Sequence, residues 1–238
     1  MIPLKTNSTE ISGSRDTFVA LKGYHSDGHD YIPDAIRRGA GAVIAEREIP
    51  IPEGVRLLVV PDTHQYLKEY LVSRYSQTLN RMKLIGVTGT NGKTTSCYLI
   101  YQLLCSLSVK CACIGTVGFY LNKERRPLNN TTPDILTLYR LLLEAQENGC
   151  EAVVMEVSSH ALAQERIAGL SFEVAGFTNL SQDHLDYHRD MRTYFSVKRQ
   201  ILSYLKENGT MLVNRDDPYF AGFLTPPIRF YSVPKGAT

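Results

Sequence analysis

Short apolar runs alternate with amphipathic stretches along the first 80 residues, and this pattern predicts a small α/β domain. The expected elements are strands over residues 17–21, 43–45 and 57–60 and helices over residues 34–38 and 64–76. Pro33 suits a first helical turn, and Gly39 and Gly41 are expected to end that helix. Thr63 is expected to cap the second helix, and the strand over 57–60 is expected to be buried because it is continuously apolar.

The same alternation continues from Arg81 to the end of the chain, with longer elements. The expected strands cover residues 84–87, 109–114, 152–155, 172–177, 211–213 and 228–233, and the expected helices cover 93–107, 134–148 and 194–206. Asp134 can cap one of these helices and Gly149 can stop it. Strands that alternate with helices predict a mainly parallel sheet covered on both faces. We therefore expect an α/β protein with domains at 1–80 and 81–238, the second of P-loop type.

Composition and charge exclude several classes of protein. The chain has 238 residues, of which 43% are hydrophobic and 21% charged, as in a globular protein. Its net charge of +2 gives no sign of a nucleic-acid or membrane partner. No apolar run is long enough to span a membrane, and the start lacks the apolar stretch of a signal peptide, so we expect a cytoplasmic protein.

The five cysteines give no disulfide framework, because their number is odd and no secretion signal is present. Cys111 and Cys113 lie two apart on an expected strand and face the same side of it. A metal pair is one interpretation. Two small thiols in the core or at the surface fit better, because no second ligand pair with zinc spacing follows.

Residues 86–95, Gly-Val-Thr-Gly-Thr-Asn-Gly-Lys-Thr-Thr, lie between an expected strand and an expected helix. Gly89, Gly92 and the residues between them can direct backbone N–H groups at a phosphate, beside the positive end of the helix. Lys93 can reach the β- and γ-phosphates, and the Thr94 hydroxyl can bind Mg²⁺. The loop departs from the common P-loop pattern, since Val87 stands where a glycine is usual. The alternative is a glycine-rich turn that only joins a strand to a helix.

Glu156 follows directly on a buried apolar strand, where a carboxylate is costly unless it is paired or bound to a cation. Together with Thr94 it can hold the Mg²⁺ that bridges the phosphates of ATP, because hard oxygen ligands suit that ion. The alternative is a salt-bridged carboxylate at the end of a strand.

Four segments in order along the chain resemble the Mur ligase family. They are Gly89-Thr90-Asn91-Gly92-Lys93-Thr94, Glu156-Val157-Ser158-Ser159-His160, Asn179-Leu180-Ser181-Gln182-Asp183-His184-Leu185-Asp186-Tyr187-His188 and Tyr194-Phe195-Ser196-Val197-Lys198. The resemblance covers nearly the whole chain. It implies a uridine-binding N-terminal domain followed by an ATP-binding central domain.

The resemblance also implies an activity: ATP-dependent addition of the third amino acid, meso-diaminopimelate or L-lysine, to UDP-MurNAc-L-Ala-D-Glu in peptidoglycan synthesis, through an acyl phosphate. The nucleotide would be held by Gly89, Thr90, Asn91, Gly92, Lys93, Thr94 and Thr95. Mg²⁺ would be held by Thr94 and Glu156, and a second metal by His184 and a carbamylated Lys198. From the residues alone, His184 would be structural and Lys198, beside Arg199, would lie on a solvated helix face.

Substrate contacts are implied by the same resemblance. In the second domain they fall on Asn130, Thr131, Thr132, Ser158, Gln164 and Arg166. Arg166 suits a carboxylate because its planar fork can make two parallel hydrogen bonds, although a surface ion pair is an equal alternative from the residue alone. In the first domain the UDP contacts fall on Tyr24, His25 and Ser26. Ser8, Thr9 and Glu10 stand where the family usually has Asp-Ser-Arg.

Members of the family have about twice this length, so the chain is expected to end inside the central domain and to lack the domain that binds the incoming amino acid. A second hypothesis is therefore a non-catalytic nucleotide-binding fragment or module of such a ligase. A third, a relative of folylpolyglutamate synthetase, fits the uridine-domain resemblance and the Glu156–His160 segment poorly.

Overall fold

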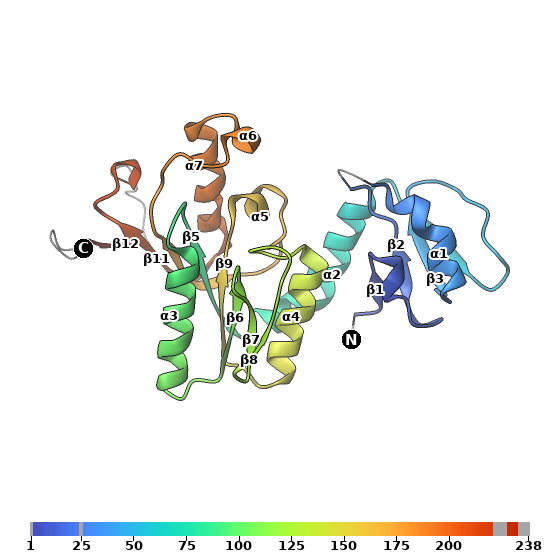
Figure 1. The fold of residues 1–238 in the computed structure, drawn as a ribbon, viewed down its shortest axis with the longest axis horizontal. Helices are drawn as coiled ribbons and strands as arrows, with labels where there is room; N and C mark the ends of the chain where they lie inside the picture. Colours follow the sequence, from blue (N-terminus) through green and yellow to red (C-terminus); the bar gives the residue numbers. More distant parts are fainter. Residues whose placement is uncertain (1, 24–25, 221–227, 233–238) are drawn as a thin grey trace. The chain divides into compact units, whose positions relative to one another are not determined.

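The structure is a computed structural model that describes residues 2–23, 26–220 and 228–232 (Figure 1). It separates into two compact units, Met1–Ser73 and Arg74–Thr238. Each unit has its own sheet, and the boundary between the units lies at 73/74, whereas the sequence analysis placed it at 80/81.

The first unit is built on a four-stranded parallel sheet in the order β1-β2-β3-β4. Its elements are β1 (Leu4–Lys5), a 3₁₀ turn (Ser8–Glu10), β2 (Thr17–Val19), a 3₁₀ turn (Gly28–Tyr31), α1 (Ile32–Arg37), β3 (Ala42–Ala45), β4 (Arg56–Val59) and the first part of α2 (Thr63–Leu79). Phe18 and Val43 from the sheet pack with Ile32 and Ala35 from α1 to form the core of this unit. The predicted strands and the helix that starts near Pro33 are confirmed.

Two predictions for this unit are wrong in detail. The strand β4 is not buried: it is an edge strand, paired with β3, and Leu58 and Val59 remain 45% and 39% exposed. The first turn of α2 is capped by Asp62, whose Oδ1 accepts from the Gln65 N–H at 2.8 Å. Thr63 instead donates its hydroxyl to the Ala20 carbonyl at 2.9 Å, because it is fully buried against β2.

The second unit contains an eight-stranded sheet in the order β12-β11-β10-β5-β9-β6-β7-β8 (Figure 1). Its strands are β5 (Lys83–Thr88), β6 (Cys111–Gly115), β7 (Gly118–Leu121), β8 (Glu124–Arg126), β9 (Ala152–Glu156), β10 (Phe172–Phe177), β11 (Leu205–Asn214) and β12 (Ile228–Tyr231). Its helices are α3 (Lys93–Ser106), α4 (Ile135–Glu147), α5 (Ser159–Ala163), α6 (Leu185–His188) and α7 (Met191–Arg199), with 3₁₀ turns at Gln200–Tyr204 and Pro218–Phe220. Strands β12 to β6 are parallel, as predicted, and the hairpin β7–β8 is antiparallel.

Both faces of this sheet are covered. On one face, Cys111, Cys113 and Val154 pack against Cys97 and Tyr101 of α3. The intervening positions point to the other face and are equally buried; these are Ala112, Ile114, Val153 and Met155. Because the sheet is buried on both sides, polar groups at the carboxyl ends of its strands are the ones that can meet a ligand.

The predicted helix over 194–206 differs most from the structure. Helix α7 starts three residues earlier, where Asp190 Oδ1 accepts from the Thr193 N–H at 2.7 Å. It ends at Arg199, and Leu205 already belongs to β11, where it pairs with Phe172. Pairing with a distant strand has overridden the local preference of this segment.

Candidate functional site

The loop between β5 and α3 has a backbone that demands glycine at two points. Gly89 and Gly92 have φ of 136° and 82°, in the region that other residues rarely adopt. A Cβ at Gly89 would also lie 2.0 Å from Thr178 Oγ1. The loop is therefore wrapped tightly against the segment that follows β10.

That segment, residues 178–181, holds the loop in place through hydrogen bonds. Asn179 accepts from the Thr90 N–H with its main-chain oxygen, at 2.9 Å, and from the Asn91 N–H with its side-chain oxygen, also at 2.9 Å. The Thr90 hydroxyl exchanges hydrogen bonds with the main chain of Ser181, at 3.0 and 3.1 Å. We expected the N–H groups of Thr90 and Asn91 to be directed at a ligand, and this is wrong because Asn179 uses both.

Residues 178–181 are themselves held in place by a residue that follows β11, the next strand of the sheet. The N–H of Leu180 donates to Asp217 Oδ2 at 2.7 Å, and the N–H of Tyr219 donates to Asp217 Oδ1 at 3.0 Å. Asp217 lies just beyond β11 and is 9% exposed. One carboxylate thus joins the ends of β10 and β11.

Two lysines converge on the loop from different helices. Lys93 Nζ donates to the main-chain oxygens of Gly89 and Thr90 at 3.0 and 2.7 Å. Lys198 Nζ, from α7, donates to the same Gly89 oxygen at 2.8 Å and lies 4.7 Å from the centre of the Tyr194 ring. Tyr194 and Lys198 are one helical turn apart and both are buried.

Burial changes the ionisation of both amines. Lys198 is 1% exposed, and its pKa falls to about 7, first because burial disfavours the charged form and second because the charge of Lys93 is close. Burial lowers the pKa of Lys93 as well, against the attraction of Glu156. The prediction of a solvated face for Lys198, made from the residues alone, is wrong.

Glu156 ends β9 and is 1% exposed. Its Oε2 accepts from the Thr94 hydroxyl at 2.9 Å, and its Oε1 accepts from the Thr116 N–H at 2.7 Å. A Cβ at Gly115 would lie 2.3 Å from Glu156 Oε1, so the carboxylate fills the space that this glycine leaves. The expected neighbours Thr94 and Glu156 are in contact, and the carboxylate is held by hydrogen bonds instead of a salt bridge.

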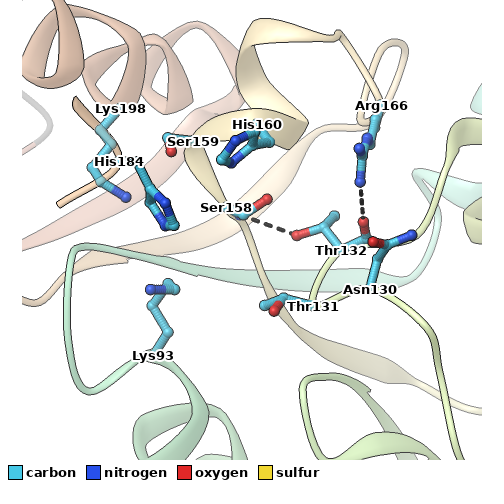
Figure 2. A pocket seen from close by; sticks show the side chains of 10 residues that line it. All are labelled: Lys93, Asn130, Thr131, Thr132, Ser158, Ser159, His160, Arg166, His184 and Lys198. Carbon is cyan, nitrogen blue, oxygen red and sulfur yellow. Dashed lines mark hydrogen bonds between the residues drawn. The ribbon is translucent and has the colours of Figure 1, made fainter. Parts of the chain in front are cut away.

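A cavity of about 290 Å³ lies beside these groups (Figure 2). Its lining includes Lys93, Asn130, Thr131, Thr132, Ser158, Ser159, His160, Arg166, His184 and Lys198. Half of the residues that the sequence singled out in the second unit therefore meet at one place. Glu156, Gln164 and the remaining nucleotide-loop residues lie outside this lining.

On the wall of the cavity formed by Thr132 and Ser158, the side chains already make hydrogen bonds within the protein. The Thr132 hydroxyl donates to the Glu156 main-chain oxygen at 2.8 Å and accepts from the Ser158 N–H at 3.0 Å. Ser158 Oγ accepts from the Ala161 N–H at 3.1 Å and so caps α5. These hydroxyls shape the wall: Thr132 is buried, Thr131 and Ser158 are half-buried, and Asn130 is exposed.

Arg166 projects over the same wall. Its Nη1 donates to the Thr132 main-chain oxygen at 2.7 Å (Figure 2). Its Nε and Nη2 donate to Gln164 Oε1 at 2.9 and 2.7 Å. An amide oxygen thus occupies the fork that a carboxylate would take. Burial lowers the pKa of Arg166, although its guanidinium stays charged.

Rings of histidine and tyrosine form the wall near α6. The His160 ring lies 5.0 Å from the His184 ring, edge to face, and 4.3 Å from the Tyr187 ring. His184 has a φ of 52° and its Nε2 lies 3.5 Å from Asp183 Oδ2. Within the described residues, no group of three or more His, Cys, Asp or Glu side chains is arranged to hold a metal.

Ser159 is a pocket residue that the sequence analysis did not select. It is 1% exposed, it lines the cavity, and its hydroxyl has no hydrogen-bond partner among the described residues. Its only signal in the sequence is its place directly after Ser158, beyond a strand that ends in a carboxylate.

The expected contacts in the first unit cannot be compared fully. Tyr24 and His25 lie outside the described residues, and Ser26 is exposed. In the described part of this unit, His29 Nδ1 lies 2.6 Å from Asp27 Oδ1, while its Nε2 accepts from the Glu46 N–H at 2.9 Å. The backbone N–H of His29 and its ring both lower the pKa of Asp27.

Among the helices of the described residues, none has both the length and the apolar character that a membrane span requires.

Comparison with known proteins matches both units to domains of one protein family. A profile described as "Mur ligase middle domain" matches residues 87–231, and one described as "Mur ligase family, catalytic domain" matches residues 4–77. The UDP-N-acetylmuramoyl-L-alanyl-D-glutamate–2,6-diaminopimelate ligase of Geobacillus thermodenitrificans is 40% identical over 98% of this chain. UDP-N-acetylmuramyl-tripeptide synthetase 2 of Oceanobacillus iheyensis is 39% identical over 91%. The chain spans 49% and 45% of the length of these two curated relatives.

Solved structures agree with the sequence matches. A UDP-N-acetylmuramoyl-L-alanyl-D-glutamate–2,6-diaminopimelate ligase superposes with a TM-score of 0.76 at 30% identity, over 99% of this chain and 49% of that one. The MurF ligase from Thermotoga maritima in complex with ADP superposes with a TM-score of 0.71 at 26% identity, over 96% of this chain and 49% of that one.

Proposed function

The chain belongs to the Mur ligase family, and on that basis we propose that it carries the ATP-dependent carboxylate activation of a peptidoglycan ligase. The substrate is UDP-MurNAc-L-Ala-D-Glu, and the amino acid added third is meso-diaminopimelate or L-lysine. The observation that carries this proposal is the cavity in which Lys93, Lys198 and Arg166 face one space.

ATP is proposed to bind with its phosphates over the start of α3. The first N–H groups of a helix have no partner within it, and together with the helix dipole they favour an anion. Lys93 currently bonds to its own loop at Gly89 and Thr90, and the same ammonium can turn to the γ-phosphate. Thr90, Asn91 and Gly92 would act by keeping the loop in shape, and Thr95 follows on the exposed face of the first turn.

The residues present fit a magnesium ion. Thr94 and Glu156 place a hydroxyl and a carboxylate 2.9 Å apart at the end of the loop, and both are hard oxygen ligands. When bound there, the ion would neutralise charge on the phosphate oxygens during transfer. Thr116 would keep the carboxylate aimed, since its N–H already bonds to Glu156 Oε1.

Lys198 is proposed to be carbamylated, and His184 to join it in holding a second metal. The amine of Lys198 is buried, donates to the Gly89 oxygen and lies close to Lys93. The neutral amine, which is the form that attacks CO₂, is therefore well populated at neutral pH. The nitrogen lone pair forms a bond to carbon, a C=O π pair moves to oxygen, and the nitrogen releases one proton to water. The product is an anion, which relieves the repulsion between two adjacent amines.

The acceptor carboxylate is proposed to lie between Lys93 and Arg166. Arg166 can exchange the Gln164 oxygen for a substrate carboxylate without losing hydrogen bonds. Asn130, Thr131 and Ser158 would border the peptide, with Thr132 behind them. An oxygen of this acceptor carboxylate attacks the γ-phosphorus, the bond to the β-γ bridging oxygen breaks, and ADP leaves with that electron pair. UDP would be held by the first unit near Tyr24, His25 and Ser26.

The test is trapping of the acyl phosphate with hydroxylamine, which replaces the third amino acid as nucleophile. The chain is incubated with ATP, Mg²⁺, bicarbonate and UDP-MurNAc-L-Ala-D-Glu, and the hydroxamate and ADP are measured. We expect hydroxamate that depends on the dipeptide substrate. Lys93→Ala should abolish it, whereas Lys110→Ala, which removes an exposed lysine, should not.

The outcomes separate the two candidate functions. ATP binding without hydroxamate would favour a non-catalytic nucleotide-binding module, for which the partial coverage of the relatives is the motivating observation. Hydroxamate formation by Lys93→Ala would refute the roles proposed here.

A further inference from the structure

Two cysteine thiols meet at the end of the second unit's P-loop helix, away from the cavity. Cys105 lies in the last turn of α3 and Cys111 begins β6. Their Sγ atoms are 3.6 Å apart, in van der Waals contact. Cys105 is exposed and Cys111 is buried.

The turn that presents these thiols is held by its own backbone. The N–H of Ser108 donates to the Cys105 oxygen and the N–H of Val109 donates to the Leu104 oxygen, each at 3.0 Å. Ser108 takes a φ of 63°, which reverses the chain after the helix. The short connection therefore keeps the two sulfurs 3.6 Å apart, and a disulfide would bring them to about 2.05 Å.

From this juxtaposition we propose that Cys105 and Cys111 are a reversible dithiol–disulfide pair that is oxidised by hydroperoxides. This site is independent of the proposed ligase function.

The two thiols have different parts in the reaction. Cys105 is the one that solvent reaches, so its sulfur attacks a peroxide oxygen, the O–O bond breaks, and the departing oxygen takes the thiol proton to leave as water or alcohol. Cys105 becomes a sulfenic acid. The sulfur of Cys111 then attacks the Cys105 sulfur, the S–O bond breaks, and hydroxide leaves with the Cys111 proton as water. In sum, two thiols lose two electrons and the peroxide gains them.

The surroundings support this order. Burial raises the pKa of Cys111 to about 12, so its buried thiol is the weaker nucleophile toward a peroxide and the exposed Cys105 reacts first. The other buried cysteines of this unit, Cys97, Cys113 and Cys150, are shielded from solvent. A bulky oxidant cannot reach them as easily as it reaches Cys105.

The pair lies far from the nucleotide loop. Lys93 begins α3 and Cys105 is near its end, so at a rise of about 1.5 Å per residue they are about 18 Å apart along the axis. A disulfide here would tie the helix to β6 at its far end, and nucleotide binding should be unchanged by it.

The experiment treats the full chain with hydrogen peroxide, blocks remaining thiols with N-ethylmaleimide, and counts and maps them after denaturation. The oxidised chain should have two fewer free thiols than the five of the reduced chain, and dithiothreitol should restore both. Trypsin cleaves after Lys110, so a disulfide would join peptide 94–110 to peptide 111–123 in non-reducing mass spectrometry. Fragment spectra then distinguish Cys105 from Cys97 and Cys111 from Cys113.

Two variants sharpen the result. Cys105→Ser, at an exposed position that tolerates serine, should lose no thiols under the same treatment, whereas Cys150→Ser should still lose two. The proposal is overturned if the wild type keeps all five thiols, if Cys105 advances to a sulfinic acid, if it links two chains on a non-reducing gel, or if Cys105→Ser still loses two thiols.

Discussion

The side-chain nitrogens of Lys93 and Lys198 donate hydrogen bonds to one acceptor, the main-chain oxygen of Gly89, at 3.0 and 2.8 Å. One lysine comes from the start of α3 and the other from α7. Two ammonium groups on one oxygen repel each other, and burial removes the water that would screen them. The site therefore favours a neutral amine at Lys198, and an anion at this position would be stabilised further by the charge of Lys93.

The pH dependence of stability should show this directly. The folded chain releases the Lys198 proton at a pKa of about 7, whereas the unfolded chain keeps it up to about 10.5. Between these values the unfolded state binds more protons, so the free energy of unfolding should rise with pH, by at most about 1.4 kcal/mol per pH unit. Below pH 7 the contribution is constant.

Urea unfolding of wild type and Lys198→Met, in CO₂-free buffer from pH 6 upward, measures this slope. The difference between the two curves should rise from about pH 7, and Lys110→Met should follow the wild type. A flat difference would mean that Lys198 is protonated in the folded chain.

Gly115 should be as necessary for metal-dependent nucleotide binding as the ligands themselves. In Gly115→Ala the new Cβ would lie 2.3 Å from Glu156 Oε1, so the carboxylate must leave Thr94. We expect affinity for ADP in the presence of Mg²⁺ to fall roughly tenfold, about 1.4 kcal/mol. Calorimetry with EDTA should show no such difference.

Gly176→Ala is the matched control, because its Cβ would meet Val87 at an ordinary 4.0 Å. Equal weakening by both alanines, or weakening that persists in EDTA, would contradict a metal role for Glu156.

Neighbouring serines should respond to alanine with opposite signs. Ser159→Ala removes a buried hydroxyl that has no partner among the described residues, so the free energy of unfolding should rise by about 1 kcal/mol. Ser158→Ala removes the cap of α5 and should lower it by about 1 kcal/mol.

Ligand binding should add a second contrast at Ser159. If its hydroxyl donates to a bound anion in the cavity, Ser159→Ala should weaken binding of UDP-MurNAc-L-Ala-D-Glu while it stabilises the empty chain. Unchanged affinity would leave Ser159 no part in recognition.

Arg166→Lys should test recognition of the D-Glu carboxylate. Lysine keeps the charge but loses the fork, so affinity for UDP-MurNAc-L-Ala-D-Glu should fall about tenfold to a hundredfold, or about 1.5–3 kcal/mol. UDP-MurNAc-L-Ala, which lacks that residue, should bind both proteins equally. A matching loss for the shorter ligand would place Arg166 elsewhere in recognition.

Local patterns in the sequence predict much of the fold. The strand Phe172–Phe177 and the helix that Asp134 caps are as expected, because apolar runs and capping residues are local signals. The hairpin β7–β8 was missed, since Gly118–Leu121 gains its strand character by pairing with β6. The end of α7 was misplaced for the same reason, as Leu205 pairs with Phe172.

The site shows a similar division. Lys93 and Glu156 follow strands, and the parallel sheet brings such positions to one edge. The bonds from Asn179 to Thr90 and Asn91 join residues nearly ninety positions apart, and no local pattern encodes them. Ser159 escaped notice because its distinguishing property is a missing partner, which only packing reveals.

The carboxylate of Asp217 gives the nucleotide loop a remote dependence. Asp217 holds Leu180, the segment around Leu180 holds Thr90 and Asn91, and these two shape the loop. A genetic screen for lost nucleotide binding would return Asp217 alongside Lys93, although Asp217 is not among the residues that line the cavity. A method that predicts the effect of a substitution from its distance to the ligand would rank a change at Asp217 as harmless. A method that follows shared hydrogen bonds would rank it as damaging.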